Sequence, residues 1–224
     1  MPRIEFDKIG ERRWETGVDH GVLYEYSNGA YTNGVAWNGL TSVSESPSGA
    51  DNTDLYADNI KYLTLRSAEQ LGLTVEAYTY PSEFEKYDGI EEVATGVKFG
   101  QQTRGTFGLC FRTNLGTDLN QDAGYKLHLV YGCSASPSDR GYQTVNDSPE
   151  ALTFSWTLTT NPVIVEGHKP VALITIDSTL VDADKLTSFL DILYGTDADP
   201  SATPPTEGTV ATLPLPEDVI KHFA

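Results

Sequence analysis

Most of the chain consists of short stretches in which apolar and polar residues alternate. In residues 152–158, for example, Leu152, Phe154, Trp156 and Leu158 alternate with threonine and serine. Because successive side chains of a strand point to opposite faces, each such stretch predicts a β-strand with one apolar and one polar face. The same pattern predicts strands at residues 20–26, 35–45, 60–67, 71–80, 103–113, 125–131 and 171–177. Strands of this kind are typical of antiparallel sheets that are solvated on one side.

Helical periodicity is clear in one stretch only, residues 182–194. Asp182 is predicted to cap the start of this helix, and Gly195 is predicted to close its end. The apolar side chains recur at the spacing of one helix face. They are Leu186, Phe189, Leu190 and Leu193.

A second, shorter helix is predicted at residues 82–88, where Ser82 and Glu85 have the spacing of a capping box. Strands nevertheless outnumber helices along the whole chain. The predicted fold is therefore mainly β: an antiparallel β-sandwich or barrel with one flanking α-helix.

Two polar stretches differ from ordinary turns. Residues 46–59 (SPSGADNTDLYADN) are long for a connection between strands, and we interpret them as a functional loop. Residues 196–216 are rich in proline and threonine and have too few apolar side chains to fold alone. We therefore divide the chain into a domain at 1–195, with an N-terminal arm, and a C-terminal extension at 196–224.

The extension ends in a predicted short helix. Pro216 suits the first helical position, and two acidic residues follow it in the first turn. Val219 and Phe223 lie four residues apart, on one face of this helix. Two interpretations stay open: the segment is an arm that docks on a neighbouring subunit through these two side chains, or it is a frayed tail.

The chain is strongly acidic, with 32 acidic and 15 basic residues and a formal net charge of −17. This balance argues against binding to nucleic acid through neutralised phosphates, because such binding depends on lysine and arginine. An acidic surface keeps a protein soluble, and it also repels a passing polyanion. No apolar run is long enough to cross a membrane, and the N-terminal residues do not have the pattern of a secretory signal.

The two cysteines, Cys110 and Cys133, fall in separate predicted strands. A disulfide between them is allowed, but two isolated cysteines in a chain of this length are more typical of a reduced cytoplasmic protein. Their spacing is not that of metal ligands.

The usual catalytic constellations are missing from the sequence. There is no phosphate-binding glycine loop, and residues 132–136 (GCSAS) lack the closing glycine of a nucleophile elbow. The four histidines are scattered, close pairs of carboxylates are expected by chance in so acidic a chain, and the acidic residues near 51–54 lack the calcium-loop pattern. We therefore predict no catalytic, cofactor-binding or metal-binding residue, and no enzyme.

Aromatic residues leave one alternative function open. Tyr24, Tyr26, Tyr31 and Trp37 either form a platform on which a sugar stacks, or pack against sheets and subunit contacts, where tyrosine is enriched. The alternative is a β-sandwich module of a virion that binds a carbohydrate or a receptor. A β-sandwich hydrolase is disfavoured, because no set of catalytic residues converges.

Several stretches in a fixed order resemble a known family. In this sequence they are 108–113 (GLCFRT), 125–132 (YKLHLVYG), 146–158 (NDSPEALTFSWTL), 162–165, 169–177 and 190–195. Together they resemble the major tail tube proteins of long-tailed, siphovirus-type bacteriophages that infect Gram-positive bacteria. The resemblance extends from the N-terminal arm to about residue 195. It rests on order and spacing, since a structural family has no catalytic motif.

The resemblance implies a β-sandwich with a flanking helix that forms hexameric rings. Stacked rings make the tail tube, through which DNA passes into the host without specific binding. The implied partners are other copies of the chain, the tape-measure protein and the terminator and initiator proteins of the tail; no cofactor and no membrane are implied. The protein would be assembled in the host cytoplasm and end in the virion.

Candidate contact residues follow from this resemblance and from the two unusual polar stretches. The candidates for contacts between rings are Ser46, Asp51, Asp54, Tyr56 and Asp58. The candidates in the C-terminal arm are Val219 and Phe223.

Overall fold

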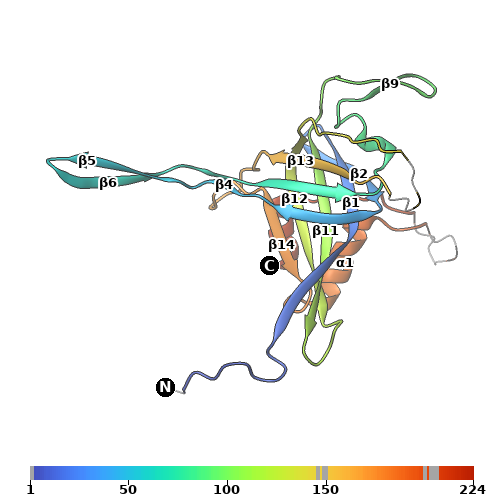
Figure 1. The fold of residues 1–224 in the computed structure, drawn as a ribbon. Helices are drawn as coiled ribbons and strands as arrows, with labels where there is room; N and C mark the ends of the chain where they lie inside the picture. Colours follow the sequence, from blue (N-terminus) through green and yellow to red (C-terminus); the bar gives the residue numbers. More distant parts are fainter. Residues whose placement is uncertain (1–2, 145–146, 148–150, 199–200, 202–206) are drawn as a thin grey trace.

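The computed structural model describes residues 3–144, 147, 151–198, 201 and 207–224, and in it the chain is mainly β (Figure 1). The strands are β1 (Arg13–Ser27), β2 (Ala30–Trp37), β3 (Leu40–Glu45), β4 (Ser48–Gly49), β5 (Asn52–Ala57), β6 (Ile60–Arg66), β7 (Glu69–Gln70), β8 (Gly72–Ala77), β9 (Glu91–Ala94), β10 (Val97–Phe99), β11 (Phe107–Thr117), β12 (Gly124–Ala135), β13 (Phe154–Thr160) and β14 (Leu173–Asp177). The helices are α1 (Ala183–Tyr194) and α2 (Pro216–Phe223), with one 3₁₀ turn, η1 (Ser82–Phe84).

One large antiparallel sheet carries the fold, in the order β2-β1-β11-β12-β13-β8-β3, and β14 pairs with β12 beside β13. The sheet curls, so that β3 returns to β1 where Leu40 lies against Gly21. A Cβ atom at Gly21 would lie 2.5 Å from Leu40 Cδ1 and 2.9 Å from the backbone oxygen of Trp37, so this close approach favours glycine. The predicted fold class, an antiparallel β-structure with a flanking helix, is confirmed.

Aromatic side chains fill the inside of the curl. The rings of Trp37 and Phe84 lie 4.5 Å apart between centroids, and Trp156 meets Trp37 edge-on at 5.4 Å. All three side chains are buried. Burial of such large rings dominates the stability of a core, so this cluster holds β2, β13 and η1 together.

A second core lies on the opposite face of the sheet, under helix α1. Cys110, Leu127 and Leu129 point to this face and are fully buried against Phe189 and Leu193 of α1. The middle of β11 and β12 is therefore covered on both faces. The expectation that every strand has one solvated face is wrong for these two. Helix α1 covers the Cys110 face of β11, and on β12 the first core reaches the face that alternation assigns to solvent, where His128 stacks on Phe111.

Helix α1 begins and ends as the sequence predicts. The Asp182 carboxylate accepts hydrogen bonds from the backbone N–H groups of Asp184 and Lys185, each at 3.0 Å. Gly195 follows the helix with a φ of 75°, a conformation that favours glycine. The start and end signals lie close to the helix in sequence, so they could be read locally.

Two local predictions are wrong. Residues 82–88 form only the 3₁₀ turn η1, and Ser82 makes no capping bond to the backbone. The predicted strand at 35–45 is two strands, β2 and β3, separated at Gly39 with a φ of 78°. Phe84 in η1 and Trp37 at the end of β2 are both buried in the core, and a short turn follows each of them.

The predicted loop at 46–59 is not a loop. It forms β4 and β5, which pair with β7 and β6 in a long hairpin that projects from the body (Figure 1). Asp58 and Asn59 connect the strands with φ values of 51° and 62°. Two consecutive residues of positive φ are the requirement of the tightest hairpin turns, so the chain reverses here without a loop.

The described part of the C-terminal extension packs on the domain. Gly34 N–H donates to Ala211 at 3.0 Å and Leu213 N–H donates to Tyr31 at 3.1 Å, which covers the edge of β2. Helix α2 begins at Pro216, as predicted, and lies beside α1. Of the proline- and threonine-rich segment, residues 199–200 and 202–206 lie outside the described residues.

Candidate assembly surfaces

The hairpin that projects from the body, residues 48–70, is called the hairpin arm below. Every residue of β5 and β6 is exposed. Leu55 pairs with Leu63, and Thr53 pairs with Leu65, so their side chains share one face of the arm. Beyond a bulge, Ala57 pairs with Ile60 on the same side. The arm therefore presents an apolar face that no other described residue covers.

The opposite face of the hairpin arm is polar, and its polar side chains bond one another across the two strands. Thr64 Oγ1 donates to Asp54 Oδ1 at 2.7 Å, and Lys61 Nζ lies 2.8 Å from the same oxygen. The Lys61 contact, with help from Thr64, lowers the pKa of Asp54. Arg66 Nε donates to Asn52 Oδ1 at 3.1 Å. These cross-strand contacts fix which face is polar and so which face is apolar.

The five candidate residues for ring contacts all belong to this arm or its base. Ser46 exchanges backbone hydrogen bonds with Gly72 where the arm leaves the body. Asp51 and Asp54 lie along the arm, Tyr56 is 71% exposed near its tip, and Asp58 forms its turn. Whether these residues contact another ring stays a prediction.

Sequence reasoning missed the apolar face of the hairpin arm. Its side chains Leu63 and Leu65 belong to β6, which was treated as a strand separate from the polar stretch before it. The Asp58-Asn59 pair was the available signal, because aspartate and asparagine adopt positive φ more readily than other residues with a side chain.

The two candidate residues of the C-terminal arm contact their own chain. Val219 is 4% exposed and belongs to the core under α1. The ring of Phe223 lies 5.1 Å from that of Phe189. In this conformation Val219 is not accessible to a neighbouring subunit, and the C-terminal segment seals the second core of its own chain.

The large sheet has two open edges, one along β14 and one along the first residues of β1. β14 pairs with β12 on one side, and no described strand pairs with its other side. At the opposite side, Arg13–Thr16 of β1 pair with β11 only, because β2 begins its pairing at Gly21. Unpaired strand edges are templates for pairing with another chain.

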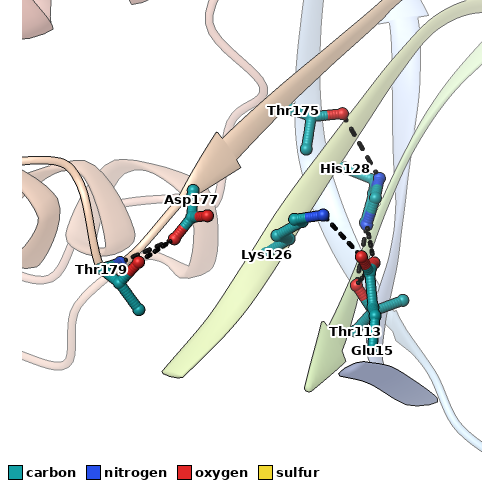
Figure 2. A network of polar contacts seen from close by, with 7 residues as sticks. All are labelled: Glu15, Thr113, Lys126, His128, Thr175, Asp177 and Thr179. Carbon is teal, nitrogen blue, oxygen red and sulfur yellow. Dashed lines mark hydrogen bonds and ion pairs between the residues drawn. The ribbon is translucent and has the colours of Figure 1, made fainter. Parts of the chain in front are cut away.

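A polar network lies across the sheet between these two edges (Figure 2). The Glu15 carboxylate of β1 accepts hydrogen bonds from Lys126 Nζ at 2.5 Å and from Thr113 Oγ1. His128 Nε2 lies 2.9 Å from Thr113 Oγ1 and 3.6 Å from Glu15. The other ring nitrogen is 3.5 Å from Thr175 of β14. The network thus ties β1, β11, β12 and β14 together on one face.

Burial sets the protonation of this network. Burial lowers the pKa of His128 and outweighs the opposing pull of Glu15. The imidazole stacks on Phe111, with 4.6 Å between centroids and 8° between planes. Burial also acts to raise the pKa of Glu15, but the hydrogen bonds from Lys126 and Thr113 lower it overall. The network therefore holds a neutral imidazole beside a paired carboxylate.

The turn after β14 is closed by its own polar contacts. Asp177 Oδ1 accepts hydrogen bonds from the backbone N–H and the hydroxyl of Thr179, at 2.9 and 2.6 Å (Figure 2). This turn leads directly into α1, so it fixes the position of the open edge relative to the helix.

The described residues offer little for chemistry. Among them, no three histidine, cysteine or acidic side chains are grouped to hold a metal ion, and no helix is long and apolar enough to cross a membrane. Cys110 and Cys133 are free thiols; burial raises the pKa of both, that of Cys110 to about 12. A thiol of such a pKa is not a nucleophile at neutral pH.

The sugar-stacking platform, one of the two interpretations of the aromatic residues, is not formed. Tyr24, Tyr31 and Trp37 are buried in the two cores, and only Tyr26 is partly exposed. Tyr24 donates its hydroxyl to the Leu193 carbonyl at 2.8 Å, which ties β1 to α1. These aromatic residues pack the fold, which was the other interpretation of their pattern.

Comparisons with known proteins give distant likenesses to solved structures. No protein-family model and no curated protein matches the sequence. Among solved structures, the chain is similar to one in the cryo-EM structure of an extracellular contractile injection system, the PVC sheath–tube complex in its extended state. The match has 12% sequence identity and a TM-score of 0.32, and it covers 78% of this chain and 94% of the other. At this level the likeness carries no argument about fold or function.

Proposed function

We propose that the chain is a structural subunit that assembles with copies of itself into stacked hexameric rings, as the tail tube of a long-tailed bacteriophage. The observation that carries this proposal is the pair of open edges on one sheet, β14 on one side and Arg13–Thr16 of β1 on the other. The resemblance of the sequence to major tail tube proteins supplies the kind of assembly and the number of subunits.

The strand directions suit a ring. Each neighbouring pair among β1, β11, β12 and β14 is antiparallel, so β1 and β14 run in opposite directions. In a ring of identically oriented copies, β1 of one copy therefore lies antiparallel to β14 of the next. This head-to-tail contact repeats around the ring and leaves no edge when the ring closes.

The hairpin arm suits contact between rings. It projects beyond the body, and its apolar face is of the kind that marks an interaction surface. Ser46, Asp51, Asp54, Tyr56 and Asp58 then act as the base, polar face and tip of the stacking element. Burial of the apolar face against another ring would stabilise the stack.

The network face of the sheet suits the wall of a channel. Helix α1 covers the other face, so the part of this face that carries the partly exposed Glu15 and Lys126 is left to line the interior. The net charge of −17 opposes adhesion of DNA to the protein. In this proposal DNA passes without specific binding, the tape-measure, terminator and initiator proteins are the tail partners, and the protein is assembled in the host cytoplasm and ends in the virion.

The test of this proposal removes one backbone donor from an open edge. Ala172 accepts a hydrogen bond from Tyr131 N–H, and Ser178 N–H donates to Tyr125, both toward β12. Because bonded positions recur at every second residue of an antiparallel ladder, the N–H of Thr175 points to the open edge. Thr175→Pro therefore deletes an outward donor and leaves the ladder to β12 intact.

Negative-stain electron microscopy of the purified protein at high concentration provides the readout. The wild-type chain and the control variant Thr175→Val are expected to form rings or hollow tubes. Thr175→Pro is expected to stay monomeric, with an unchanged circular dichroism spectrum. Rings formed by Thr175→Pro, or a wild-type chain that is monomeric at every concentration, would contradict the proposal.

A further inference from the structure

The first seven described residues form a second unpartnered apolar segment. Residues 3–9, called the N-terminal arm below, form no helix or strand. Ile4, Phe6 and Ile9 of this arm are 75%, 82% and 77% exposed. Side chains of this size are seldom so exposed in groups, so the segment is suited to covering an apolar surface elsewhere.

The body holds the N-terminal arm at its base. Gly10 N–H donates to both carboxylate oxygens of Asp118, at 2.9 and 3.1 Å, and Asp118 N–H donates to the Arg12 carbonyl at 3.2 Å. Arg12 also donates from its guanidinium to the Asp7 carbonyl at 3.0 Å. The arm therefore leaves the body at a fixed point, and its apolar residues lie beyond that point.

The apolar face of the hairpin arm needs a partner for physical reasons. Leu55, Ile60 and Leu65 are 43%, 63% and 55% exposed. A two-stranded hairpin is only marginally stable alone in water, and a third apolar layer or strand is needed for it to stay ordered. Both segments thus carry apolar side chains that no other described residue covers.

The two segments also match in size and charge. Thr53–Ala57 of the hairpin arm and residues 4–9 of the N-terminal arm each span about 17–20 Å when extended. The polar residues between Ile4, Phe6 and Ile9 carry charges of both signs, as do those that flank the apolar face of the hairpin. Residues 3–9 contain two acidic and two basic residues, and the hairpin arm contains four acidic and two basic residues, so the contact does not set two net negative segments against each other.

The chain does not make this contact with itself. The N-terminal arm and the hairpin arm leave the body at separate points and project away from it (Figure 1). A second copy can bring its N-terminal arm to the hairpin of the first without any change in the body.

We propose that the N-terminal arm of one copy packs Ile4 and Phe6 on the apolar face of the hairpin arm of another copy. This inference rests on the proposed function, because it names the segment that the stacking element receives. Each chain then donates one arm and accepts another, which makes the contact head-to-tail and allows it to continue along a stack.

Disulfide cross-linking between two full-length variants tests the contact. Phe6→Cys in one preparation is mixed with Leu63→Cys in the other and oxidised mildly. Cys110 and Cys133 do not compete, because both thiols are buried. The matched control replaces Leu63→Cys by Thr64→Cys, since Thr64 lies on the polar face, where it bonds Asp54. All three positions are exposed or point away from the core, so the variants are expected to fold.

The expected product is a disulfide between positions 6 and 63 of different chains, identified by mass spectrometry of the linked peptides. It should be lost when the cysteine is moved to position 64. Equal yields at 63 and 64, a product linking 63 to 63, or no product would overturn the inference. Electron microscopy of the same mixtures separates the two proposals: rings without the 6–63 product overturn this contact alone, and the product without rings overturns the ring assembly alone.

Discussion

At the scale of single residues, His128 shows how one buried side chain connects strands that are far apart in sequence. It lies between Thr113, Glu15 and Thr175 on three other strands, is 7% exposed and stacks on Phe111. An imidazole in such a place contributes most when neutral, because its charged form would lose hydration. The pH dependence of stability follows from this position.

The protein is expected to lose stability as the pH falls below neutrality. The pKa of His128 is lowered by burial, against the pull of Glu15 and Glu45, so the unfolded chain binds the proton at a higher pH than the folded chain. The contribution of His128 to the free energy of unfolding is therefore complete above the ordinary histidine pKa of about 6.5. It is lost as the pH decreases from there through the lowered pKa of the folded state. Each unit by which the pKa is lowered corresponds to about 1.4 kcal/mol.

Urea unfolding at a series of pH values between 5 and 8 measures the effect. His128→Gln is expected to remove this part of the pH dependence while leaving the remaining acidic groups to titrate. Identical pH profiles for the variant and the wild-type chain would show that His128 is not responsible.

A second prediction at this scale concerns the start of α1. Asp182→Ala removes the acceptor of two backbone hydrogen bonds and is expected to lower stability by about 1 kcal/mol. Asp182→Asn keeps an acceptor and should recover most of the loss. Thermal unfolding of the three proteins provides the comparison; equal melting temperatures would rule out a capping role.

At the scale of elements, the hairpin arm is separable from the body. Ser67 N–H donates to the Asp51 carbonyl at 3.1 Å, so the two strands are already close at this point. Replacing residues 52–66 by Asn-Gly should therefore close a tight hairpin without disturbing β3 and β8. The arm contributes no residue to either core.

The shortened chain is expected to keep its stability and to form rings that do not stack. Size-exclusion chromatography and electron microscopy distinguish single rings from tubes. Tubes of normal length from the shortened chain would show that stacking uses another surface. A chain that no longer folds would contradict the separability argued from the cores.

At the scale of the whole molecule, charge opposes assembly. Copies of a chain with a net charge of −17 repel one another, and salt screens this repulsion over roughly 10 Å at 0.1 M. Assembly is therefore expected to increase as the ionic strength is raised. Light scattering across a salt series measures it, with a neutral osmolyte as control. An unchanged or decreasing signal would indicate that ion pairs between copies dominate instead.

The sequence alone determined the features that depend on near neighbours. Alternation located β8, β11, β12, β13 and β14 of the large sheet, the 3.6-residue period located α1, and Asp182 and Gly195 marked its ends. The start of α2 at Pro216 was also predicted correctly, because the proline and the acidic residues of the first turn lie within the helix itself. Each of these signals is carried by residues within one element, so no knowledge of the remaining chain was needed.

The tertiary structure decided which strands meet and what covers them. The polar stretch at 46–59 became half of a hairpin because β6 supplies its partner, and Leu63 there makes a face that the stretch alone does not contain. Val219 became a core residue because the C-terminal segment returns to α1. The network of Glu15, Lys126 and His128 joins positions more than 100 residues apart. Contacts of this kind depend on long-range pairing, and the local pattern of a chain does not specify it.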